Sequence, residues 1–259
     1  MIGTDTEVLL KDGTGNYVSS IGLIGGSKAE PYLVDNGNLQ EDNVLAEFAI
    51  DPVDSKQEWL DNIHSTFGIL QVKMKEYDLE IDIKSSAHFD AAQLEHPRAK
   101  EFGCTPDFNA YSLQENTPPD GEEVGSLRSC GGHVHVSFDE IAGTDTNTKA
   151  EFVRILDLLL GVPSVLMDDD TERRLLYGQA GAHRPKEYGV EYRTLSNFWI
   201  QSDEHMEWVY DQVKRAEQMY KDGYRISYEV GTAAINCINN GDVETARSLI
   251  QEHKLEVVS

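Results

Sequence analysis

The chain has 259 residues, 39% of them hydrophobic, which is enough to bury the core of one large domain or two small ones. Forty-six acidic residues against 22 basic ones give a net charge of −24, which repels nucleic acids and anionic membranes. No apolar run is long enough to span a bilayer, and the first ten residues lack the order of a signal peptide. The composition predicts a globular protein that binds neither nucleic acid nor membrane.

The predicted elements alternate along the chain between period-two segments and helical segments. In chain order they are a strand at 4–10, a strand at 45–50, a helix at 55–77, a long loop at about 97–129, a strand at 132–138, a helix at 151–160, a strand at 189–195, and helices at 203–221 and 242–256. No repeat or clear linker interrupts them. The pattern predicts a single domain over 1–259, with the motifs at about 1–200 and the C-terminal helices at about 203–256.

The cysteines indicate the compartment. Cys104, Cys130 and Cys237 are odd in number and widely spaced, with no C-x-x-C pair. This pattern favours neither a disulfide framework nor a structural zinc site. We therefore expect a cytoplasmic protein.

Each predicted strand carries ionisable residues on one face and apolar residues on the other. If the four strands form one antiparallel sheet with helices on its apolar face, the polar face collects Asp5, Glu7, Glu47, His133, His135, Glu191 and Arg193. Carboxylates and imidazoles are ligands for Mg²⁺ or Mn²⁺, and acids at close range need a counter-charge. Taken singly, each residue is more typical of a solvent-facing or structural position. Their joint occurrence favours a metal site.

A basic cluster lies just before and within the last predicted strand, in a chain that is otherwise acidic. It consists of Arg173, Arg174, Arg184, Lys186 and Arg193. Such a concentration suits a polyphosphate, and Arg193 beside Glu191 offers a planar fork for phosphate or carboxylate. The alternative is that these residues are surface charges paired with nearby aspartates.

Two familiar motif classes are not supported. GLIGGSK, residues 22–28, ends in Ser-Lys where a P-loop needs Gly-Lys-Ser/Thr, so a tight hairpin with Lys28 at its tip is the simpler interpretation. A turn whose amides approach a substrate is the alternative. Neither H-E-x-x-H nor G-x-S-x-G occurs, so zinc-protease and serine-hydrolase chemistry has no motif here.

Three motifs in order resemble those of the glutamine synthetase and glutamate–cysteine ligase superfamily: GTDTE, CGGHVHVSF and GVEYR. With IGLIGGSKAEP and NVLAEFAIDP added, the set resembles the phage-type COOH–NH2 ligases, type 2, a branch found in tailed-phage genomes. The resemblance covers roughly residues 1–200. It implies a glutamine synthetase-like catalytic fold, with a curved, mainly antiparallel sheet and helices on its convex face.

The resemblance also implies roles for individual residues. It assigns Mg²⁺, or Mn²⁺ in its place, around the ATP phosphates to Asp5, Glu7, Glu47, His133 and Glu191. It assigns the nucleotide to His135, Ser137, Lys28 and Arg174, and the transferred phosphoryl group to Arg193, Arg184 and Lys186. Asp5 departs from the usual Glu, which shortens the side chain by one methylene.

The implied activity is an ATP-dependent carboxylate–amine ligase that forms an amide or peptide bond through an acyl phosphate. A carboxylate needs such activation because oxide is not a leaving group in water. A metal-dependent hydrolase and a non-catalytic nucleotide- or metal-binding protein stay open as alternatives. The substrates would be small-molecule or peptide acids and amines, and the acidic stretch 111–124 hints at a cationic amine. The sequence indicates neither their identity nor an oligomeric state.

Overall fold

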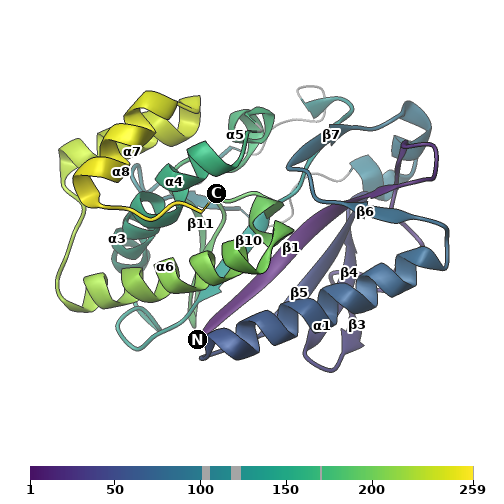
Figure 1. The fold of residues 1–259 in the computed structure, drawn as a ribbon, viewed down its shortest axis with the longest axis horizontal. Helices are drawn as coiled ribbons and strands as arrows, with labels where there is room; N and C mark the ends of the chain where they lie inside the picture. Colours follow the sequence, from purple (N-terminus) through teal and green to yellow (C-terminus); the bar gives the residue numbers. More distant parts are fainter. Residues whose placement is uncertain (101–105, 118–123, 170, 259) are drawn as a thin grey trace.

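The main feature of the fold is an open antiparallel sheet with helices on one of its faces (Figure 1). The computed structural model describes residues 1–100, 106–117, 124–169 and 171–258. The strands are β1 (Ile2–Lys11), β2 (Tyr17–Val18), β3 (Tyr32–Val34), β4 (Gly37–Asp42), β5 (Leu45–Val53), β6 (Glu80–Asp82), β7 (Ser86–His88), β8 (Phe108–Asn109), β9 (Leu127–Ser129), β10 (Gly132–Val136), β11 (Ala182–Lys186) and β12 (Gly189–Tyr192). Their order in the sheet is β3-β4-β5-β1-β10-β12-β11-β8, with β2 and β6 on β1 and β7 paired separately with β9. The predicted α+β class is confirmed.

The four strands predicted from alternation are neighbours at the centre of this sheet, as β5, β1, β10 and β12. The register sets Glu7 opposite Glu47, Asp5 opposite His133, and His135 opposite Glu191. Opposite residues on one face of a sheet have Cβ atoms about 4.5–5.5 Å apart. Strand pairing therefore brings these ionisable side chains together from segments far apart in the sequence.

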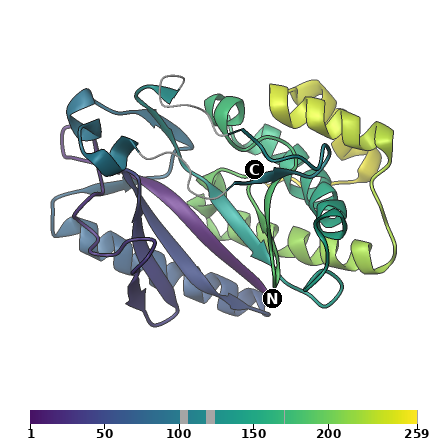
Figure 2. The same cartoon turned by 180° about the vertical axis from the view of Figure 1, so that it is seen from behind.

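Helices α1 and α6 lie on the same face of the sheet, as the two opposite views show (Figures 1 and 2). The helices are α1 (Lys56–Lys75), α3 (Thr146–Leu156), α4 (Val162–Met167), α5 (Glu172–Leu176), α6 (Asp203–Lys221), α7 (Tyr228–Asn240) and α8 (Val243–His253), with a π-helical turn at Asp157–Gly161 and 3₁₀ turns at Ala91–Leu94, Pro97–Lys100 and Asn197–Gln201. Within the described ranges, none of these helices is both long and apolar enough to cross a membrane.

Three of the predicted helices begin close to the predicted residue, each at a capping side chain. Ser55 caps α1, Ser202 caps α6 and Asp242 caps α8, each by accepting a bond from a first-turn amide. The helix predicted at 151–160 begins five residues earlier, at Thr146, because Asp145 caps α3 with its carboxylate 2.8 Å from the Thr148 amide.

Other parts of the chain were predicted wrongly or missed. α7 was missed because Gly231 and Thr232 interrupt its apolar pattern, although Ser227 caps its start. The stretch predicted as one long loop contains the short strands β8 and β9 where the structure describes it. Cys104 lies outside the described residues, whereas Cys130 and Cys237 are buried thiols that form no disulfide in the described parts.

Apolar residues fill the space between the sheet and the helices. Val134 and Val136 of β10 are buried there, and Trp59 of α1 stacks on Trp199 with ring centroids 5.6 Å apart. This face holds the main hydrophobic core. The opposite face of the central strands is consequently left for polar side chains.

Asp157 is a buried acid on the helix side of the sheet. Its Oδ1 accepts hydrogen bonds from the Tyr192 hydroxyl at 2.8 Å and the Thr194 hydroxyl at 3.2 Å. Burial outweighs these bonds and raises the pKa of Asp157 to about 7. The folded state therefore holds this proton at pH values where the unfolded chain, with a pKa of about 4, has lost it.

The sign of this shift predicts that the stabilisation from Asp157 is complete below about pH 4 and is lost as the pH rises towards 7. The side chain in Asp157→Asn cannot ionise, so the variant does not lose this stabilisation as the pH rises. The free energy of unfolding of the variant minus that of wild type should therefore increase by about 3 kcal/mol from about pH 5 to about pH 8. Urea unfolding of both proteins at the two pH values measures this. A difference that does not change with pH would contradict it.

Candidate active site

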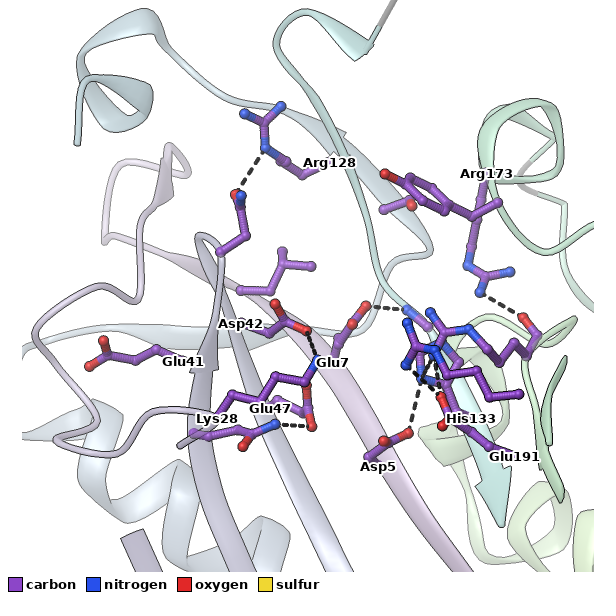
Figure 3. Close-up of a pocket in the computed structure, with 18 of the residues that line it drawn as sticks. Asp5, Glu7, Lys28, Glu41, Asp42, Glu47, Arg128, His133, Arg173 and Glu191 are labelled. Carbon is purple, nitrogen blue, oxygen red and sulfur yellow. Dashed lines mark hydrogen bonds and ion pairs between the residues drawn. The ribbon is translucent and has the colours of Figure 1, made fainter. Parts of the chain in front are cut away.

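A cavity of about 450 Å³ opens on the polar face of the central strands. Its walls come from β1, β4, β5, β10, β11 and β12, from the turn at 27–29, and from α5 with the following Tyr177. Acidic side chains of β1, β4, β5 and β12 line it, and basic ones come from β11, α5 and Arg193 on one side and from Lys28, Arg98 and Arg128 elsewhere (Figure 3). The predicted carboxylates Glu7, Glu47 and Glu191 thus share one face and one cavity.

The first acidic group joins Asp5 of β1, His133 of β10 and Glu191 of β12. One ligand atom from each lies within 4.8 Å of the others, and Asp5 Oδ1 is 2.9 Å from His133 Nδ1. Although burial tends to raise it, His135 and His133 lower the pKa of Asp5 well below its usual value. Burial and Arg193 lower the pKa of His133 to about 4. At neutral pH the carboxylate is ionised and the imidazole is neutral, the states that ligate cations.

Three basic side chains surround Glu191. Its carboxylate is 3.0 Å from Arg184 Nη1 and 2.9 Å from Lys186 Nζ, and it also accepts a hydrogen bond from Arg193. Burial and Asp5 tend to raise the pKa of Glu191, but Arg193 and the other cations lower it to about 2. The charge of the first group is therefore balanced by the protein itself.

The second acidic group consists of Glu7, Asp42 and Glu47, with one oxygen from each within 4.8 Å of the others. Burial and Asp42 raise the pKa of Glu7 to about 7, and burial with the neighbouring carboxylates raises the pKa of Glu47 well above its usual value. Lys28 Nζ is 3.8 Å from Asp42, on a side chain that is half exposed. Raised pKa values mean that carboxylate charge is still poorly balanced in this group.

Both groups fit a hard divalent cation. They offer carboxylate oxygens and one imidazole nitrogen, the donor types that Mg²⁺ and Mn²⁺ accept. Burial first, and neighbouring carboxylates second, raise the pKa values of Glu7 and Glu47, and a bound cation would favour their ionised forms. The second group therefore fits a cation better than the first, whose Glu191 is already paired with Arg184, Lys186 and Arg193.

The basic residues of the cavity differ from the sequence prediction, since Arg98 and Arg128 line it and were not predicted. Arg184, Lys186 and Arg193 line the cavity as predicted, but Arg174 does not. The Arg174 guanidinium is buried against α4, 3.2 Å from the Ser164 carbonyl oxygen. Its neighbour Arg173 enters the cavity instead.

The main chain holds Arg173 in place. Its guanidinium donates to the carbonyl oxygens of Thr194 at 2.9 Å and Arg193 at 3.1 Å. Gly178 leaves room for it, because a Cβ there would lie 1.8 Å from Arg173 Nη1. Helix α5 has only five residues, so its orientation against the sheet decides which arginine faces the cavity.

Besides Arg174, two further residues assigned to the nucleotide do not line the cavity. His135 lies at the side of the first acidic group, with Nε2 3.2 Å from Asp5 Oδ2 and Nδ1 2.5 Å from the Tyr188 hydroxyl. Ser137 lies beyond the end of β10, where its backbone exchanges hydrogen bonds with Met1 at 3.0 and 2.7 Å. His135 thus orients Asp5, and Ser137 closes the edge of the strand pair.

The glycine-rich turn binds a carboxylate of the protein itself. The amides of Gly22, Ile24 and Gly25 lie 3.0, 3.2 and 3.3 Å from the same oxygen of the buried Glu41. A P-loop points such amides at a phosphate, so the structure removes the remaining similarity to that motif. Lys28, which follows the turn, does line the cavity beside Asp42.

Asp42 is the acidic site residue that sequence reasoning missed. Gln40 and Asp42 line the cavity from β4, and Gln40 Nε2 is 2.5 Å from Glu47 Oε1. The alternation in GNLQED was a usable signal, because Leu39 lies in the core between polar neighbours. The charged Glu41, which is buried beside the turn, hid that alternation.

The fold and the site define an α+β protein with a polar cavity in which carboxylates and cationic side chains face each other. The chain belongs to the family described as phage phiEco32-like COOH.NH2 ligase-type 2, whose model matches residues 123–255. The match includes His133, Glu191, Arg193 and the C-terminal helices, whereas the predicted resemblance covered about 1–200. The segment 1–122, with the GTDTE motif and Glu47, lies outside the match. The family name indicates a ligase. A comparison with curated proteins finds no match.

Proposed function

We propose that this protein is an ATP-dependent carboxylate–amine ligase that works through an acyl phosphate, on a glutamine synthetase-like catalytic fold. The observation that carries the proposal is the cavity itself, in which the first and second acidic groups lie with Arg184, Lys186 and Arg193. Hydrolysis of a neutral amide needs no such cluster of cations. Transfer of a phosphoryl group does, because charge develops on its oxygens.

Two sets of side chains would hold Mg²⁺, namely the group of Glu7, Asp42 and Glu47 and the group of Asp5, His133 and Glu191. When bound, Mg²⁺ supplies charge neutralisation on the phosphate oxygens. Gln40 and the Gly131 amide keep Glu47 and Glu7 oriented, the latter through a bond of 2.6 Å to Glu7 Oε2.

To bind a phosphate, the three basic side chains Arg184, Lys186 and Arg193 must release the carboxylate that they bind in the structure. In the structure they bind Glu191, which cannot ligate a cation with all three in place. A polyphosphate that enters the cavity offers these side chains oxygen atoms of higher charge. We therefore expect nucleotide binding to free Glu191 and so to complete the first cation site.

The chemistry then requires no nucleophile from the protein. An oxygen of the substrate carboxylate attacks the terminal phosphorus of ATP, and ADP leaves. The amine nitrogen attacks the acyl carbon, inorganic phosphate leaves, and the amide forms with loss of a proton from nitrogen. Arg193 and its basic neighbours would bind the transferred phosphoryl group in both steps.

The products of ATP test this proposal. Incubation with Mg²⁺, ATP and pools of amino acids, polyamines and peptides should yield ADP and inorganic phosphate, with slow leakage to water when the acid is absent. Chromatography of the nucleotides and mass spectrometry of the condensed product measure both. Formation of AMP and pyrophosphate would overturn the acyl-phosphate mechanism, and amide hydrolysis without ATP consumption would overturn the ligase.

A further inference from the structure

Arg193 lies between two carboxylates from different parts of the chain. It hydrogen bonds to Glu191 of β12, the strand that ends just before it, and its Nε is 3.4 Å from Asp107 Oδ2. Its Nη1 is also 3.2 Å from His133 Nδ1. Only 14% of the Arg193 side chain is exposed, so these neighbours fix the guanidinium in the cavity wall.

Asp107 is itself held by the sheet. It directly precedes β8, which pairs with β11 so that Phe108 is opposite His183. The Asp107 carbonyl oxygen accepts a hydrogen bond of 2.9 Å from the Asn116 amide. The backbone at Asp107 is therefore hydrogen-bonded on both sides, which fixes the position of its carboxylate beside Arg193.

The two carboxylates that hold Arg193 differ in what else they do. Glu191 belongs to the first acidic group and binds two further cations, Arg184 and Lys186. If Glu191 turns to a divalent cation, Arg193 loses its hydrogen-bonded partner. Asp107 belongs to neither acidic group. It is thus a fixed counter-charge for Arg193 that metal binding does not remove.

We infer that Asp107 is a positioning residue, which keeps Arg193 in the cavity when Glu191 exchanges its cations for a divalent metal ion. The inference rests on the proposed function, because that exchange is driven by the nucleotide. Without Asp107, Glu191 is the ion-paired carboxylate that Arg193 keeps among the described residues, and Arg193 competes with the metal ion for it. The first cation site then fills less readily, while the second site, Glu7–Asp42–Glu47, is unaffected.

Binding of Mn²⁺ tests the inference without the ligase reaction. Electron paramagnetic resonance counts bound Mn²⁺ on the full chain, with and without an ATP analogue whose β,γ-bridge is nitrogen. For Asp107→Asn we expect nucleotide-free Mn²⁺ affinity within about twofold of wild type, and the nucleotide-dependent Mn²⁺ affinity lowered roughly fivefold or more. Asp107→Glu should recover part of that loss. Glu151→Gln is the matched control, because it breaks an exposed carboxylate–arginine pair of 2.8 Å with Arg225, away from the cavity.

The outcomes are distinguishable. Wild type without nucleotide-dependent Mn²⁺ binding would overturn the proposed function together with the inference. Normal coupling in wild type and in Asp107→Asn alike would overturn the inference alone. Equal loss of nucleotide-free and nucleotide-dependent binding in Asp107→Asn, or a large fall in its unfolding midpoint, would mean that Asp107 has only a structural role.

Discussion

Alanine in place of Gly131 should lower nucleotide-dependent Mn²⁺ binding and ligase activity by roughly a hundredfold. A Cβ at this position would lie 2.1 Å from His133 Nε2 and 2.6 Å from its Cε1. The backbone cannot yield easily, because the Gly131 amide bonds to Glu7 Oε2 at 2.6 Å and its carbonyl oxygen accepts from the Glu7 amide at 2.9 Å. The imidazole must therefore turn away from Asp5, which dismantles the first acidic group.

The same clash should lower the free energy of unfolding by about 1–3 kcal/mol, the usual range for overpacking. Gly68→Ala is the matched control, since Gly68 lies inside α1 with open space at its Cβ position. A helical glycine replaced by alanine should gain about 0.5–1 kcal/mol and keep wild-type Mn²⁺ binding. Thermal unfolding and Mn²⁺ titration measure both variants. Full Mn²⁺ binding by Gly131→Ala would show that His133 takes no part in the site.

Glutamine in place of Glu47 should weaken nucleotide-free Mn²⁺ binding at least about tenfold while leaving the metal-free protein as stable as wild type. Burial and nearby carboxylates raise the pKa of Glu47 well above its usual value, so glutamine resembles the protonated side chain of the metal-free state. A metal ion must displace that proton to gain a charged ligand, and glutamine offers only a neutral oxygen.

The free energy of unfolding, measured with and without Mn²⁺, separates the effect of Glu47→Gln on metal binding from its effect on the metal-free protein. At a Mn²⁺ concentration about 100 times the wild-type Kd, wild type should gain about 2.7 kcal/mol and a tenfold weaker variant about 1.4 kcal/mol. Asp211→Asn removes one negative charge on the helix side, where Asp211 pairs with Lys56 at 2.6 Å, and should retain the full gain. Equal gains for Glu47→Gln and wild type would place the cation outside the second group.

The polar face of the central strands could be predicted because it depends on local alternation. Asp5 and Glu7, or Glu191 and Arg193, are two residues apart, and extended backbone sets such pairs on one side. Apolar residues at the intervening positions then identify the sheet face that meets the helices. Periodicity also found α1 and α6, and the family match includes the HVH and EYR motifs.

Asp42 and Asp107 lie beside that polar face, but no local sequence pattern connects their segments with the central strands. Asp42 joins Glu7 and Glu47 through the pairing of β4 with β5, and Asp107 reaches Arg193 through the pairing of β8 with β11. Their place in the site depends on sheet order, which the spacing of residues along the chain does not encode.

The sequence alone thus determined which side chains share a strand face, and tertiary structure alone decided their electrostatic state. Glu191 and Glu47 look alike as single glutamates in alternating strands. Glu191 is ionised because Arg184, Lys186 and Arg193 converge on it, whereas burial among other carboxylates favours the protonated form of Glu47. Coulomb interactions depend on distances through space and on burial, and both are set only when β4, β5, β1, β10, β12 and β11 assemble in order.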